Sequence, residues 1–472
     1  MLTYHLDPQA KTPLYEQLYR AIRADILSGA LPGDARLPAK RRLAEHLEIS
    51  RITVESAYAQ LLAEGYLYSV PRSGMFVQKS ARGLQPLPPR TPAPAAGSGA
   101  EGKPAFAFDF DTGAVDTDCF PFSIWAKLSR AVLTEYESRI LLSSEPQGAP
   151  ALRREIARYL REFRGILVEP EQIIVGAGSE YLVTLIIQLL GRTRTYALEN
   201  PCYPKLEQIF AASGARTAYL PLDHAGLSME ALEQTDATVV YLTPSHHFPL
   251  GVVTSAARRM ALLRWASEGE GRYLIEDDYD SEFRFASRPI PALKELDARD
   301  QVIYLNTFAK SLAPSLRIGY AVLPRGLLAE FRRRFSAYSS TVPAFEQYTL
   351  ARFMESGAFD RQINRLRTVY RSRRDCLLGA LAASPLAGRY AASGTEAGIH
   401  LLLTVDGISE AELVRRAAET GCRVHGLSEY YVAGTQADCP PSTVLLGYGG
   451  MADARLTAGV ARLAEAWKSE NQ

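Results

Sequence analysis

Hydrophobic residues in the first 80 positions recur at the spacing expected of helices. Leu18, Ile22 and Ile26, together with Tyr15, fall on one helical stripe that ends at residues 28–29. A shorter helical segment covers residues 39–47, and residues 51–64 form a third. Four apolar side chains of the third segment are expected to face inward: Val54, Ala57, Leu61 and Leu62. Since Ser50 is placed to cap the third segment after a tight connection, the last two helices predict a helix-turn-helix.

Two short β-prone runs follow, at residues 66–68 and 75–77, and residues 71–74 between them have the composition of a turn. These runs predict a hairpin with Arg72 at its tip. A hairpin next to a helix-turn-helix makes a winged helix, so residues 1–80 are expected to form one compact domain.

The remainder of the chain alternates β-prone runs with helical patterns. Runs typical of buried strands lie at residues 173–175, 195–198, 272–275 and 302–305. This alternation predicts an α/β domain with a mostly parallel sheet. From about residue 367 the pattern indicates a smaller α/β subdomain with strands at 398–404 and 444–446. His400 is expected to be a packing histidine or one that supports the site residues from behind.

The composition changes between these two regions. Residues 81–104 are rich in Pro, Ala, Gly and Ser, a mixture that cannot build a core and acts as a tether. We therefore predict a winged helix-turn-helix at residues 1–80, a linker at 81–104 and an α/β domain at 105–472.

Composition also excludes several classes of protein. The 472 residues are 47% hydrophobic, which is enough to bury more than one core. No run of about 18 apolar residues occurs and the amino terminus lacks a signal pattern, so we expect a cytoplasmic protein with no membrane contact. The five cysteines are scattered without metal-ligand spacing, which predicts free thiols and no metal site.

The placement of basic residues in the first domain indicates DNA binding. Residues 1–80 hold 10 Lys and Arg against 8 Asp and Glu, so net charge alone is uninformative. The candidates to contact phosphates and base edges lie at the starts of the second and third helices and on the wing: Lys40, Arg41, Arg42, Arg51, Thr53 and Arg72. The alternative is a protein-docking helical bundle with a solvated basic face.

Lys310 follows the predicted strand at residues 302–305, where open α/β sheets place their ligands. A reactive amine there, with Arg317 seven residues later, suits a cofactor that carries an aldehyde and a phosphate. The cofactor implied is pyridoxal 5'-phosphate, bound as a Schiff base to Lys310. Taken alone, however, a lysine is more often a solvated surface charge than a reactive group.

Further candidates follow other strands. Asp277 is placed to keep a pyridine nitrogen protonated, although an aspartate after a strand is as often a helix cap. The sequence Gly178-Ser179-Glu180 opens a helical pattern whose free N–H groups and dipole would meet a phosphate at Ser179. Thr307 adds a hydroxyl, and Tyr203 is either a ring that stacks on the cofactor or a core tyrosine.

A resemblance to a known family covers nearly the whole chain. It rests on residues 146–148, 152–153, 164–165, 199–201, 243–246, 276–283 and 307–310, and the first domain adds Leu37-Pro38, Arg41, Leu43-Ala44, Ser50-Arg51, Thr53-Val54, Ala57-Tyr58 and 64–66. These motifs resemble the MocR subfamily of GntR regulators, a winged helix-turn-helix fused to a fold-type-I aminotransferase-like domain. Ala39 and Lys40 depart from the usual small hydroxyl residues of the GntR-type domain.

The resemblance implies a role for each matching residue. Lys310 would hold the cofactor, Asp277 its pyridine nitrogen, and Tyr279 would lie near its ring hydroxyl. The resemblance places Tyr203 against the ring, and the phosphate against Ser179, Thr307 and Arg317. It also implies a head-to-tail homodimer in which each winged helix is held by its tether.

Two functions from different classes fit these features. The first is a regulator that binds a double-stranded DNA operator and whose large domain senses pyridoxal phosphate or an amine effector. The second is an active aminotransferase with an appended DNA-binding domain, and a repressor with a dead domain is a third reading. Phe248 in place of an asparagine, Ala309 before the lysine, and the lack of an arginine at residues 445–449 favour the sensor. Lys205 is a candidate anion grip for an effector, or else a solvated lysine at a helix start.

Overall fold

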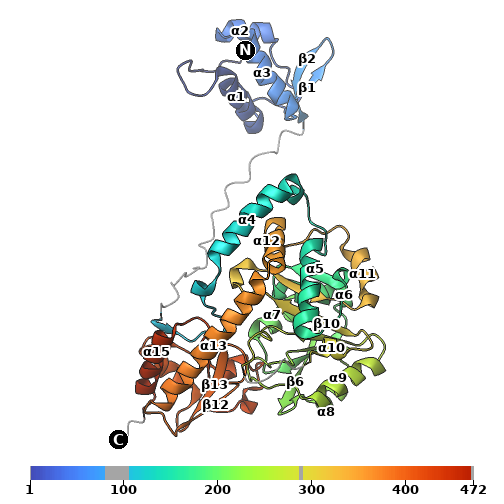
Figure 1. The fold of residues 1–472 in the computed structure, drawn as a ribbon. Helices are drawn as coiled ribbons and strands as arrows, with labels where there is room; N and C mark the ends of the chain where they lie inside the picture. Colours follow the sequence, from blue (N-terminus) through green and yellow to red (C-terminus); the bar gives the residue numbers. More distant parts are fainter. Residues whose placement is uncertain (1, 80–105, 286–290, 469–472) are drawn as a thin grey trace. The chain divides into compact units, whose positions relative to one another are not determined.

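The computed structural model describes residues 2–79, 106–285 and 291–468. The chain divides into two compact units, residues 1–103 and 104–472 (Figure 1). The predicted linker at residues 81–104 lies outside the described residues.

The first unit contains three helices and a two-stranded hairpin. Their bounds are α1 (Leu14–Ser28), α2 (Lys40–Leu47), α3 (Arg51–Ala63), β1 (Leu67–Val70) and β2 (Gly74–Val77). Glu48, in the left-handed conformation with φ 56°, ends α2. Ser50 Oγ then accepts the backbone N–H of Thr53 at 3.1 Å and caps α3. The predicted helix-turn-helix and wing are therefore confirmed.

Two residues expected in the core of this unit lie outside it. Leu18, Ile22 and Ile26 are buried as predicted, but Tyr15 and Leu62 are each more than a third exposed. Consecutive helical residues are rotated by about 100°, which places Leu62 at the edge of the inward face that contains Leu61. Leu61 is buried, with Tyr58 one turn before it, and Tyr19 rather than Tyr15 completes the stripe of α1.

The second unit is built on a twisted central sheet. Among the described residues, eight strands lie in the order β4-β11-β10-β9-β8-β5-β6-β7. Strands β10, β9, β8, β5 and β6 pair in parallel, whereas β11 is antiparallel to both β4 and β10. Their bounds are β4 (Ile173–Gly176), β5 (Thr195–Asn200), β6 (Arg216–Asp223), β7 (Gly226–Leu227), β8 (Val239–Leu242), β9 (Tyr273–Asp277), β10 (Val302–Thr307) and β11 (Gly319–Val322). The mostly parallel sheet predicted from the strand pattern is confirmed.

Helices cover both faces of this sheet because its strands are apolar on both sides. Ile173 and Val175 of β4 pack with α5 and α12, whereas Ile174 packs with α6 and α11 on the opposite face. The helices of this part are α4 (Phe122–Tyr136), α5 (Pro150–Tyr159), α6 (Ser179–Leu190), α7 (Pro204–Ala212), α8 (Met229–Glu233), α9 (Ala256–Glu268), α10 (Leu293–Leu296), α11 (Arg325–Phe335) and α12 (Ala344–Glu355).

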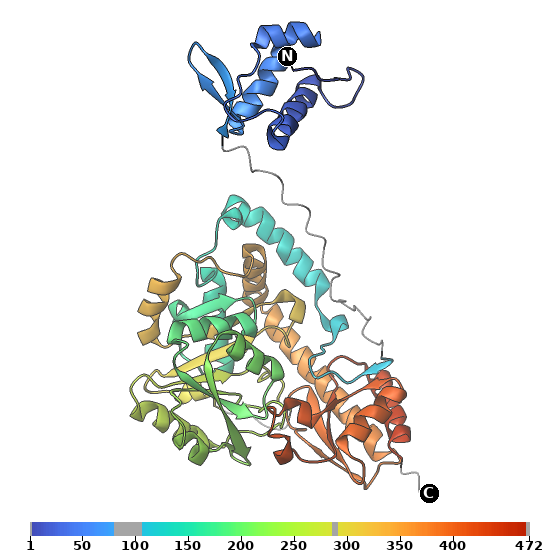
Figure 2. The same cartoon turned by 180° about the vertical axis from the view of Figure 1, so that it is seen from behind.

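A smaller subdomain follows, as expected from the pattern after about residue 367. Its antiparallel sheet has the order β12-β13-β16-β15, and α13 and α15 lie against it (Figure 2, orange and red). Its elements are α13 (Ala358–Ala382), β12 (Tyr390–Ser393), β13 (His400–Val405), α14 (Glu410–Glu419), β14 (Cys422–Arg423), β15 (His425–Gly426), β16 (Thr443–Gly447) and α15 (Asp453–Ala466). The short strand β3 (Phe108–Asp109) pairs in parallel with β14, which ties the beginning of the unit to its end.

The topology of the large sheet brings the predicted site residues to one edge. Strands β4, β10, β9, β8 and β5 run in the same direction, so their carboxyl ends meet there. No helix of the described residues is long and apolar enough to cross a membrane.

Candidate functional site

Lys310 lies three residues beyond the end of β10, at this edge of the sheet. Its Nζ donates hydrogen bonds to the backbone oxygens of Thr112 and Gly113, each at 3.0 Å. Burial lowers the pKa of Lys310 from 10.5 to about 8, against the opposing effect of Asp111 and Asp280. At pH 7 this leaves roughly 300 times more neutral amine than an ordinary lysine has. Lys310 is therefore suited to condense with a carbonyl group.

Asp277 ends β9, and β10 lies beside it in the sheet. Its Oδ2 accepts a hydrogen bond from the Tyr241 hydroxyl at 2.5 Å, whereas Oδ1 is buried with no hydrogen-bond partner among the described residues. Burial raises the pKa of Asp277 to about 7, and Asp278 adds to the rise, while the bond from Tyr241 opposes it. An unsatisfied buried carboxylate oxygen is costly, so Oδ1 fits an N–H donor such as a protonated ring nitrogen.

The turn before α6 forms a cradle for an anion. Gly178 has φ 86°, and a Cβ there would lie 3.3 Å from Nη2 of Arg317. Helix α6 begins at Ser179 with no side-chain cap among the described residues, so its first N–H groups point out of the helix. Together the free N–H groups and the guanidinium above them make a site suited to a phosphate.

Arg317 also contacts its surroundings directly. Its Nη2 donates to the backbone oxygen of Ala177 at 3.2 Å and to Oε2 of Glu180 at 2.6 Å. Lys205 lies on the other side of Glu180, with Nζ 3.5 Å from Oε1. Thr307 is the last residue of β10, and its Oγ1 accepts the backbone N–H of Ala309 at 3.4 Å.

Aromatic rings form one wall of the site. The Phe248 ring meets Tyr203, Tyr279, His400 and Tyr430 edge to face, at centroid distances of 5.7, 6.1, 5.2 and 5.3 Å. Tyr203 is 46% exposed, so it is not a core tyrosine and its ring is open to a ligand.

Polar groups link this wall to the rest of the site. The Tyr279 hydroxyl lies 3.2 Å from Nδ1 of His246, which is 2.7 Å from Oδ2 of Asp280. Lys205 Nζ lies 5.9 Å from the centre of the Tyr203 ring. These contacts connect Tyr279, through Phe248 and Tyr203, to Lys205, Glu180 and Arg317.

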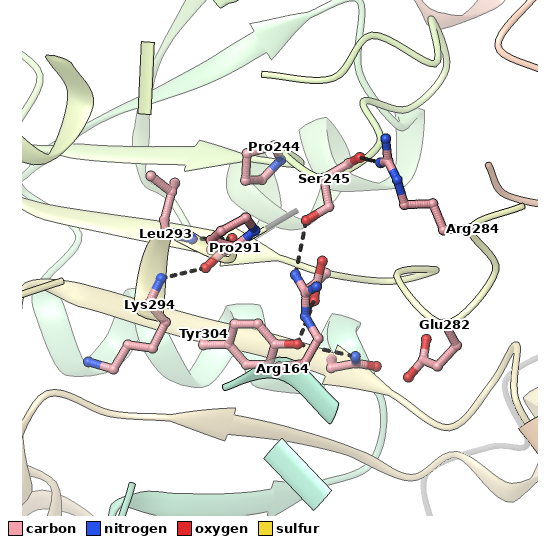
Figure 3. Close-up of polar contacts among 12 residues, drawn as sticks. Arg164, Pro244, Ser245, Glu282, Arg284, Pro291, Leu293, Lys294 and Tyr304 are labelled. Atoms are coloured by element: carbon pink, nitrogen blue, oxygen red, sulfur yellow. Dashed lines mark hydrogen bonds and ion pairs between the residues drawn. The ribbon is translucent and has the colours of Figure 1, made fainter. Parts of the chain in front are cut away.

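A buried polar network includes Arg164, Ser245 and Tyr304 (Figure 3). Arg164 and Asp278 are almost fully buried, and Arg164 Nε lies 2.9 Å from Asp278 Oδ2. The Tyr304 hydroxyl donates to the same oxygen at 2.6 Å, and Arg164 Nη2 donates to Ser245 Oγ at 3.2 Å. Asp278 directly follows Asp277 in the chain, so this network anchors the chain next to Asp277.

The predicted DNA-contacting residues gather at one end of the helix-turn-helix and on the wing. Arg41 and Arg51 have well-exposed side chains that pair with acids one turn later, Arg41 with Glu45 at 2.9 Å and Arg51 with Glu55 at 3.1 Å. Exposed pairs of this kind contribute little, so both guanidinium groups are available to a phosphate or base.

The other candidates in this unit differ in how exposed they are and in whether their side chains already have partners. Lys40 Nζ lies 3.7 Å from Glu55, and Arg42 is exposed on α2. The Thr53 hydroxyl already has a hydrogen-bond partner, because it lies 2.8 Å from Ser50 Oγ in the cap of α3. Arg72 is exposed at the tip of the hairpin with φ 61°.

The sequence reasoning missed several residues of these sites. Tyr241 holds Asp277, and the backbone of Thr112 and Gly113 meets Lys310, although nothing in the local pattern marks them. Ile52 is 73% exposed beside Arg51 at the start of α3. Its exposure was detectable, because Ile52 falls outside the inward stripe of Val54 and Ala57.

Two family models match the two units. The model of bacterial regulatory proteins of the gntR family matches residues 14–77, and that of aminotransferase class I and II matches residues 108–463. Among solved structures, a kynurenine aminotransferase from Pyrococcus horikoshii has a TM-score of 0.68 at 26% identity, with 78% of this chain and 92% of that chain covered. The α-aminoadipate aminotransferase LysN from Thermus thermophilus has a TM-score of 0.67 at 26% identity, covering 79% and 94%.

Full-length relatives combine both units. The HTH-type transcriptional regulator YdeL of Bacillus subtilis is 37% identical over 470 residues, which is 99% of each chain. The probable rhizopine catabolism regulatory protein MocR of Rhizobium meliloti is 33% identical, covering 98% of this chain and 95% of that protein. The pyridoxine biosynthesis regulator PdxR of Corynebacterium glutamicum is 34% identical, covering 98% and 97%.

The fold and the matches define a DNA-binding transcription regulator with an aminotransferase-type second domain. The chain belongs to the MocR type of GntR-family regulators.

Proposed function

We propose that the second unit binds pyridoxal 5'-phosphate at Lys310 and senses it, or an amine that reacts with it, to alter operator binding by the first unit. The main support is the pairing of two complementary features at one edge of the sheet. Lys310 has a pKa near 8, and Asp277 presents a buried oxygen that lacks a partner among the described residues. These are the groups that an aldehyde and a protonated pyridine nitrogen require.

The other site residues fit the rest of the cofactor. Tyr203 offers a ring for stacking, Tyr279 a hydroxyl for the ring oxygen, and Ser179, Thr307 and Arg317 surround the phosphate. When bound, pyridoxal phosphate supplies an aldehyde for amines and a ring that withdraws electrons from them. Lys205, which lies over Tyr203, is the proposed anion grip for an effector, and a solvated helix-start lysine remains the alternative.

Contact with DNA is assigned to α3, the start of α2 and the wing. Arg51 would read bases or phosphates, with Lys40, Arg41, Arg42 and Arg72 on the backbone. Ile52 adds an exposed apolar side chain of the kind that meets a thymine methyl group.

A homodimer, arranged head to tail, would present two winged helices to operator half-sites. Helix α4 supports it, because Phe122, Ile124 and Leu133 are exposed apolar residues on this helix and Leu141 and Leu142 follow it. Exposed apolar side chains gathered in this way mark interaction surfaces.

The domain is proposed to be a sensor rather than an enzyme. By resemblance to the enzymes of this fold, Phe248 replaces an asparagine that meets the cofactor hydroxyl, and its ring contacts four other rings instead. Leu445, on β16, is fully buried and offers no charge to a substrate carboxylate. Residual transamination is compatible with this proposal, and an active aminotransferase with an appended DNA-binding domain is the competing function.

The contacts of Lys310 suggest how its condensation with an aldehyde would affect DNA binding by the first unit. Thr112 and Gly113 belong to the segment that follows the predicted linker, and their backbone oxygens hold the lysine ammonium. Condensation of the ammonium with an aldehyde releases water and leaves at most one N–H on the nitrogen, so the two bonds cannot both persist. A ligand that changes this segment would shift operator binding by at most its differential affinity for the two states.

Borohydride labelling tests the cofactor site. Purified protein treated with pyridoxal phosphate and borohydride should carry the reduced cofactor on Lys310, which peptide mass spectrometry locates. Lys310→Ala should abolish the adduct, whereas Lys468→Ala, which alters an exposed lysine just past the end of α15, should keep it. Labelling of a different lysine at full stoichiometry would refute the assignment.

A further inference from the structure

Glu180 places a carboxylate at the anion-binding side of the cradle. Its Oε2 lies 2.6 Å from Arg317 Nη2, and its Oε1 lies 3.5 Å from Lys205 Nζ. Hydrogen bonding to Arg317 lowers the pKa of Glu180, so the carboxylate is charged at neutral pH. The bridge therefore joins two cations through one carboxylate.

The position of the bridge matters because Arg317 is the guanidinium of the cradle. A Cβ at Gly178 would lie 3.3 Å from the same Nη2 that binds Glu180, so this nitrogen lies over the turn whose N–H groups face outward. A phosphate held by that turn would meet Arg317 at the nitrogen that Glu180 already uses. Two anions on one exposed guanidinium repel each other, by about 1 kcal/mol at 4 Å even in water.

We propose that Glu180 competes with the cofactor phosphate for Arg317 and so weakens cofactor binding to a range in which it is reversible. Lys205 receives the carboxylate when the phosphate takes Arg317. This inference rests on the proposed function, since it concerns affinity at the same cofactor site. It makes Glu180 a residue that sets affinity for the phosphate in particular and not for the aldehyde or ring.

A supporting role for Glu180 predicts the opposite result. An acid in the first turn of a helix stabilises the helix, and its bond to Arg317 holds the guanidinium in place. If that were its main contribution, removing the charge would weaken phosphate binding.

The test is a titration of the full-length protein with pyridoxal phosphate and, separately, with pyridoxal, which lacks the phosphate, both followed by absorbance. Glu180→Gln should bind pyridoxal phosphate about fivefold more tightly or better, the factor that corresponds to roughly 1 kcal/mol. Its affinity for pyridoxal should match that of the unaltered protein. Glu207→Gln removes the same charge from nearby α7 and should change neither affinity.

A second variant tests the transfer of the carboxylate. Lys205→Met leaves Glu180 with Arg317 alone, so it should weaken pyridoxal phosphate binding, and this effect should disappear in the Glu180→Gln background. Weaker binding of pyridoxal phosphate by Glu180→Gln, or an equal gain for pyridoxal, would overturn the inference. Binding of neither aldehyde by the unaltered protein would overturn the proposed function as well.

Discussion

Asp277 titrates near neutral pH because it is buried and lies close to Asp278 and Asp280. A pKa raised to about 7 means that the carboxyl gains its charge as pH rises through 7 and loses it as pH falls. Only the charged form attracts a protonated ring nitrogen. Cofactor binding should therefore become weaker below this pH.

This pH dependence can be isolated with pyridoxamine phosphate, an amine that does not condense with Lys310. Between pH 6 and 7.5 its affinity for the unaltered protein, relative to Asp277→Asn, should rise by up to about tenfold per pH unit below the pKa. Isothermal titration calorimetry measures both. A constant ratio across this range would show that Asp277 does not meet the ring nitrogen.

Some residues of the site could be predicted from the sequence and others could not. Lys310, Asp277 and Ser179 each come at or just after a short buried strand, and the carboxyl ends of such strands meet at one edge of the sheet. Tyr241 lies inside a strand, where a tyrosine is usually packing. Nothing local shows that its hydroxyl reaches Asp277.

Backbone groups are also invisible in the sequence. The oxygens of Thr112 and Gly113 reach Lys310 from a segment almost 200 positions away, and only the fold brings them there.

Among the helices and strands of the first unit, α3 is the one that we most expect to contact DNA. Arg51→Ala should weaken operator binding by about 1–3 kcal/mol if the guanidinium makes a bidentate base contact. Arg20→Ala is a matched control, because Arg20 is an exposed arginine of α1 that pairs with an acid in the same way. Fluorescence anisotropy at fixed salt compares them, and equal affinities for the two variants would remove Arg51 from the interface.

Helices and strands were largely predictable because their apolar periods are clear. The five elements of the first unit and the four predicted strands of the large sheet all occur in the structure. The error at Leu62 arose because this residue lies at the edge of the inward face of α3, where the apolar period alone does not decide burial. The hydrophobic pattern could not predict the burial of Arg164 with Asp278, because charged residues normally lie at the surface.

For the whole molecule, the order of the motifs revealed more than any one of them. A winged helix, a Pro-rich stretch and an α/β domain with a reactive lysine together point to one type of regulator, which the matches along both units establish. The contribution of the structure is the physical arrangement around that lysine. Lys310 touches the segment that leads into the domain, and Glu180 is paired with the Arg317 guanidinium.

The central claim is that the cofactor state of Lys310 controls DNA binding. The direct measurement is the affinity of the protein for a duplex that it has itself selected from random sequence, with and without pyridoxal phosphate and candidate amines. We predict a change of about 5- to 150-fold for the unaltered protein, none for Lys310→Ala, and transamination far slower than about 10 per second. Ordinary turnover with a common amino acid, together with DNA affinity indifferent to every ligand, would contradict the account.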